Sequence, residues 1–173
     1  MRPLALLAAL LPAVALAQPA VDVRFGDLTR FTDLRVSILT TDRDRQGLAE
    51  ELARHLVSAA APLLPPGTRL AVTITDVDMA GEYPPITGSM SRDIRVIKDV
   101  YPPRIDLDFT LTRADGSIER EGHRELRDAG FLWSASPLDR DRLVHEKGLL
   151  DGWLRRELGP PSPHAALPRD TKR

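Results

Sequence analysis

The chain has 173 residues, of which 25 are acidic and 24 are basic, giving a formal net charge of −1, and 42% of its residues are hydrophobic. These values suit one globular domain and exclude the broad positive surface of a nucleic-acid-binding protein. The chain contains no cysteine, which excludes disulfides, thiolate nucleophiles and cysteine-bound zinc.

The first residues have the pattern of a secretory signal peptide. Arg2 precedes the apolar run 4–16, and Ala15-Leu16-Ala17 fits the small-x-small rule for cleavage. The apolar run is shorter than a membrane span requires. We therefore expect a signal peptide over residues 1–17, a periplasmic or secreted protein that begins at Gln18, and no stable membrane span after cleavage.

The first half of the mature chain predicts a strand, a helix and a second strand. Residues 21–25 alternate between apolar and polar side chains, and the run 69–79 is rich in β-branched residues. Between them, residues 40–64 have helical spacing of apolar side chains, at Leu48, Leu52, Leu56, Ala59 and Leu63. Two strands joined by a helix form a right-handed parallel crossover if they share a sheet.

The second half predicts mainly antiparallel strands and a last helix. We expect strands at 94–100, 104–112 and 117–128, a turn at 114–117 and a helix at 139–158. The sequence thus predicts a single α+β domain over residues 18–158. Its four- to five-stranded mixed sheet, mostly antiparallel, carries two helices packed on one face. Residues 159–173 are expected to form a disordered tail.

Three carboxylates, Asp76, Asp78 and Glu82, lie at the end of the predicted strand 69–79 and just beyond it, and we call them the acidic corner. The apolar face of this strand switches at Asp76, which indicates a bulge or the exit of the strand from the sheet. The spacing differs from that of a calcium-binding loop. We expect these carboxylates to form ion pairs with arginines of the neighbouring segments, namely Arg92, Arg95 and Arg104.

Other catalytic and binding patterns are incomplete. His145-Glu146 lacks the second histidine of a zinc protease, because position 149 is Leu149. Tyr83 and Tyr101 each precede two prolines, and an exposed tyrosine there is a candidate contact for a partner. The alternative is that these prolines only terminate strands and protect edges.

Several of these residues together resemble a bacterial exported family, domain of unknown function 3016. The resemblance rests on the segments 31–33, 76–82, 101–107, 126–128, 146–147 and 150–153. It implies an exported bacterial protein and implies no activity. Its charged positions are candidates for a polar network or a ligand site: Asp76, Asp78, Glu82, Arg104, Asp128, Glu146 and Lys147.

Three functions remain open from the sequence. The first is a non-enzymatic envelope protein, an accessory or binding module for another envelope protein or a small ligand, with no catalytic residue, cofactor or metal. The second is a cation-dependent or catalytic protein that uses the acidic corner, with Arg104 or His145 nearby. The third is a peptide-binding module at a sheet edge near Tyr83 and Tyr101.

Overall fold

Four strands form one mixed sheet in the computed structural model, which describes residues 20–83, 94–134 and 140–159. The strands are β1 (Val21–Phe25), β2 (Arg69–Asp78), β3 (Arg104–Thr112) and β4 (Ile118–Arg127). They lie side by side in sequence order. The first two are parallel and the other two pairs are antiparallel, so the predicted mixed, mostly antiparallel α+β sheet is confirmed.

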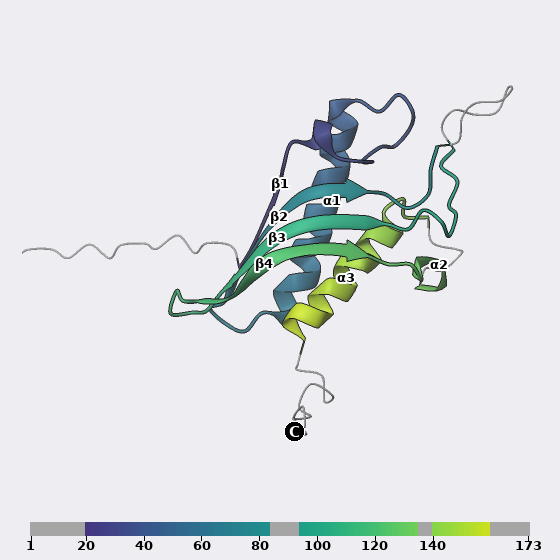
Figure 1. Cartoon of the computed structure of the whole chain (residues 1–173). Coiled ribbons are helices and arrows are strands. Elements are labelled where there is room, and N and C mark those ends of the chain that lie inside the picture. Colours follow the sequence, from purple (N-terminus) through teal and green to yellow (C-terminus); the bar gives the residue numbers. More distant parts are fainter. Residues whose placement is uncertain (1–19, 84–93, 135–139, 160–173) are drawn as a thin grey trace, which may run out of the picture.

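Two long helices, α1 (Asp42–Ala60) and α3 (Val144–Leu158), cover one face of this sheet (Figure 1). The shorter elements are η1 (Leu28–Arg30), η2 (Ala61–Leu63) and α2 (Phe131–Ser134). None of the helices in the described ranges has the length and apolar character that a membrane crossing requires. The predicted signal peptide and most of the predicted tail lie outside the described residues.

Helix α1 starts and ends where its sequence dictates. Thr41 and Asp44 form a reciprocal capping box, which satisfies backbone donors of the first turn. Leu48, Leu52 and Leu56 are buried against the sheet, as their spacing predicts. The helix stops at Ala60, before the predicted end at 64, because Pro62 belongs to the following 3-10 turn, η2. Helix α3 likewise begins at Val144 and not at 139.

The sheet has one buried face and one open face. On β3, Ile105, Leu107 and Phe109 are at most 3% exposed, and Phe109 meets Trp153 of α3 edge-on at 5.6 Å between ring centroids. Asp106 and Asp108 alternate with them and belong to the other face. This alternation confirms the strand that the sequence marks most clearly.

The segment 94–100, the third predicted strand in chain order, is not a strand, so that prediction is wrong and the sheet has four strands. Only Val96 makes a bridge, to Glu82. Its apolar residues Ile94, Ile97 and Val100 are 61%, 41% and 66% exposed. The reason is topological: β2 and β3 pair directly with each other, so the connection between them has no place in the sheet.

Strand β2 contains a bulge, one of the two alternatives that the break in its apolar face indicates, and it stays paired with β3 as far as Asp78. The β2–β3 register shifts between Ile74 and Asp76, which moves Val77 and Met79 onto the buried side. Beyond the strand, Gly81 has φ +80°, and an added Cβ there would overlap the carbonyl oxygen of Val96. Only glycine suits this position.

Candidate functional site

The acidic corner does not form one site, because its three carboxylates have different surroundings. Asp76 accepts hydrogen bonds from the backbone N–H and the hydroxyl of Thr32, both at 2.6 Å. Glu82 accepts from Lys98 Nζ at 2.6 Å, and this bond lowers the pKa of Glu82. Arginines were predicted as partners for these two; among the described residues Arg95 and Arg104 pair with neither of them, and Arg92 lies outside the described residues.

Asp78, the third carboxylate of the corner, is partly buried. It lies opposite Arg104 in the β2–β3 register and forms a parallel bridge with Asp33. Burial raises the pKa of Asp78, and the nearby charge of Asp33 adds to this effect, while Arg104 opposes it. Asp78 and Arg104 are thus close to each other, as predicted, but burial has the larger effect on the pKa of Asp78.

Arg95 organises the exit of β2. Its guanidinium donates to the carbonyls of Met79, Ala80 and Gly81 at 3.2–3.3 Å, so three successive peptide units curve around one cation. It also donates to Asp33 Oδ1 at 3.0 Å. The side chains of Arg95 and Asp33 are only 12% and 9% exposed. A buried charge requires such partners, so this pair fixes the loop.

Two further side chains extend this pair toward solvent. Arg35 Nε donates to the same oxygen of Asp33 at 2.8 Å. Tyr83 places its ring over the Arg95 guanidinium, at 4.6 Å from the centroid, and its hydroxyl donates to the Arg35 carbonyl at 3.4 Å. Two guanidinium groups therefore share one carboxylate, and the partly buried Asp78 also interacts electrostatically with both of them.

Glu146 connects α3 to the same turn of backbone. It is 1% exposed, and its Oε1 accepts from the N–H of Ala80 at 2.7 Å. Its Oε2 is buried and has no hydrogen-bond partner within the described part of the chain. Burial raises the pKa of Glu146 to about 7, although the bond from Ala80 and the charge of Arg95 oppose this.

Lys147 and Asp128, the other charged candidates, act elsewhere. Lys147 Nζ donates to Glu51 of α1 at 2.7 Å and to Asp141, so it joins the two helices. Asp128 accepts from the N–H of Gly130 at 2.8 Å, a local turn before α2. The predicted network is therefore several separate contacts, and Glu146 is the member that meets the β2 exit.

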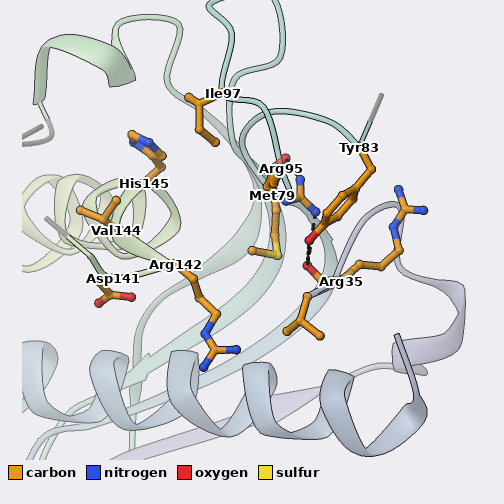
Figure 2. Close-up of a pocket in the computed structure, with 10 residues that line it drawn as sticks. Arg35, Met79, Tyr83, Arg95, Ile97, Asp141, Arg142, Val144 and His145 are labelled. Carbon is orange, nitrogen blue, oxygen red and sulfur yellow. Dashed lines mark hydrogen bonds between the residues drawn. The ribbon is translucent and has the colours of Figure 1, made fainter. Parts of the chain in front are cut away.

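A cleft of about 420 Å³ lies beside this network, and we call it the α3 cleft (Figure 2). Four segments line it: the loop before α1, the exit of β2, the connection to β3 and the start of α3. The lining residues are Arg35, Val36, Met79, Tyr83, Arg95, Ile97, Asp141, Arg142, Val144 and His145. In Figure 2, Tyr83 and Met79 flank Arg95 on one side, and Val144 and His145 form the other.

The start of α3 gives the cleft its second wall. Its N-cap, Leu143, supplies no side-chain hydrogen bond to the first turn, although Asp141 accepts from the N–H of Leu143 at 2.9 Å. The His145 ring packs edge-on against Phe131 of α2, 4.8 Å between centroids. Phe131 is 1% exposed, so the core holds this wall in position.

The sequence identified part of this site. Tyr83 lines the cleft with its ring against Arg95, whereas Tyr101 is 42% exposed and lies near Lys98. Tyr83 follows β2 and Tyr101 precedes β3, and these are the two inner strands of the sheet. Neither tyrosine therefore adjoins an edge strand. Sequence reasoning missed the site roles of Arg35 and Arg142, and it used Asp33 only as part of a family motif.

No group of three or more histidine, aspartate or glutamate side chains in the described ranges is arranged to hold a metal ion. Residues 19–156 match the model of the family described as protein of unknown function (DUF3016), so the chain belongs to this family and the resemblance is confirmed. No curated protein and no solved structure matches the chain.

Proposed function

We propose that this member of the DUF3016 family is an exported, non-enzymatic binding module that holds a small ligand in the α3 cleft. The observation that carries the proposal is the cleft itself: about 420 Å³, within the range of small-molecule sites, with six polar or charged and four apolar lining residues. Apolar surface beside polar groups that can orient a ligand is a property of small-molecule sites.

The way in which the cleft is built supports binding. Arg95 is fixed by Asp33 and by three backbone carbonyls, and Asp141 is engaged by Lys147. Side chains that are already fixed lose little conformational entropy when a ligand arrives, which favours affinity. The same contacts of Arg95 and Asp141 also stabilise the fold.

The α3 cleft can be tested by filling it. Ile97 lines the cleft and is 41% exposed, whereas Val100 in the same connection is 66% exposed and does not line it. A library of fragment-sized compounds is screened by thermal shift against the wild type, Ile97→Trp and Val100→Trp. A compound at 100 times its Kd stabilises its target by about 2.7 kcal/mol.

The expected result is a set of compounds that raise the Tm of the wild type and of Val100→Trp and leave that of Ile97→Trp unchanged. Compounds that stabilise all three proteins equally would bind outside the cleft and would contradict the proposal. Both tryptophan variants are first compared by circular dichroism, so that a misfolded variant is recognised.

Export is the second part of the proposal, and it is supported by the pattern of residues 1–17. The complete chain, expressed with its own leader in a Gram-negative bacterium, should be recovered from the periplasm or the medium. Mass spectrometry should then find Gln18 at the N-terminus. Recovery from the cytoplasm of a chain that still carries residues 1–17 would refute export.

A further inference from the structure

We propose that the ligand of the α3 cleft carries a carboxylate on an apolar body, and that Arg142 binds this carboxylate. The inference rests on the proposed binding function and names its ligand class. Two kinds of ligand fit this description, a free small acid and the C-terminus of a peptide. Both present a carboxylate next to an apolar group.

The charges of the cleft favour an anion. Three of its ten lining residues are arginines and one is an acid, Asp141, which Lys147 engages. Asp33, behind the wall, is shared by Arg35 and Arg95. The other acids that act on these arginines, Asp44 and Asp78, do not line the cleft, so a ligand carboxylate inside it would face more cationic than anionic lining groups.

Arg142 differs from the other two arginines of the cleft, Arg35 and Arg95, which both pair with Asp33. It is exposed and interacts electrostatically with Asp44. Within the part of the chain that the structure describes, no ion pair of Arg142 falls within 4.0 Å. Arg95, by contrast, is bound to the β2 exit. A planar guanidinium whose N–H groups are not already bound can donate two parallel hydrogen bonds to a carboxylate.

The apolar walls select the rest of the ligand. Val36, Met79, Ile97 and Val144 contribute aliphatic or thioether surface, and the side chain of Met adapts to varied shapes. Burying an aliphatic group of the ligand there contributes about 25 cal/mol for each Å² removed from water. A carboxylate without an apolar body would leave this surface wet and would bind more weakly.

The probes are N-acetyl-leucine and an acetylated tripeptide that ends in leucine, each as the free acid and as the amide. Binding is followed by amide NMR titration of the wild type, Arg142→Gln and the matched control Arg140→Gln. Arg140 is exposed and does not line the cleft. The signals of Met79 and Val144 report whether a probe enters the cleft.

The wild type and Arg140→Gln should bind at least one acid in the cleft, at least about tenfold more tightly than its amide, as expected when a charged hydrogen bond is lost. Arg142→Gln should abolish this difference. Whether the single amino acid or the peptide binds better identifies the source of the carboxylate.

Two results would overturn the inference. Equal affinity of acid and amide, with shifts at Met79 and Val144, would refute the role of the carboxylate and leave the binding function standing. The absence of any cleft shift with all four probes would refute the ligand class. The proposed function would then be judged by the separate comparison of Ile97→Trp with Val100→Trp.

Discussion

The buried carboxyl of Glu146 makes the stability of this protein depend on pH near neutrality. Its pKa rises from 4.5 to about 7 in the folded protein, so between these pH values the folded protein keeps a proton that the unfolded chain has released. The unfolding free energy therefore falls as the pH rises from about 4.5 to about 7, and it levels off above. The loss amounts to about 3 kcal/mol, at about 1.4 kcal/mol per pKa unit.

Glu146→Gln removes this titration while it keeps an oxygen that can accept from the N–H of Ala80. The variant should gain stability relative to the wild type as the pH rises from about 4.5 to 7, by up to about 3 kcal/mol. Urea unfolding at a series of pH values measures this difference, because each curve gives an unfolding free energy. A pH-independent cost of placing the amide in this site would shift all the differences equally and would not alter how they change with pH.

Glu125→Gln is the matched control. The side chain of Glu125 is 80% exposed, so its replacement should change the unfolding free energy by less than about 0.5 kcal/mol at every pH. If the difference between Glu146→Gln and the wild type were the same at pH 4.5 and pH 8, Glu146 would not titrate near 7. The account of its burial would then be wrong.

Further experiments test the β2 exit and the cation hypothesis. Arg95→Met should cost about 3–5 kcal/mol in urea unfolding because it removes the more buried of the two guanidinium partners of Asp33 together with the donor to three backbone carbonyls, whereas Arg35→Met should cost less, since the Arg35 side chain is 41% exposed. Gly81→Ala should cost at least about 1–3 kcal/mol, whereas Gly47→Ala in α1, where an added Cβ meets nothing within 4 Å, should stabilise by up to about 1 kcal/mol. Addition of EDTA should leave the Tm unchanged because the acidic corner forms no convergent set of ligands; a fall of several degrees would revive the cation hypothesis.

Local patterns determined the elements of this fold. The alternation in β3, the helical spacing in α1 and the break in the apolar face of β2 are properties of neighbouring residues, and the structure confirms each of them. The strand predicted at 94–100 was wrong because the local pattern of its apolar residues resembles that of a strand. Whether a segment joins a sheet depends on which strands are already paired.

By itself, the sequence also determined the family, through scattered charged motifs that fall within residues 19–156. The partners of those charges were decided only by the tertiary structure. Asp33 and Arg95 are 62 positions apart, and Ala80 and Glu146 are 66 apart. A carboxylate pairs with whichever donor the fold brings within about 3 Å. The sequence suggested Arg95 as a partner of the acidic corner, whereas the path of the backbone after β2 places it beside Asp33.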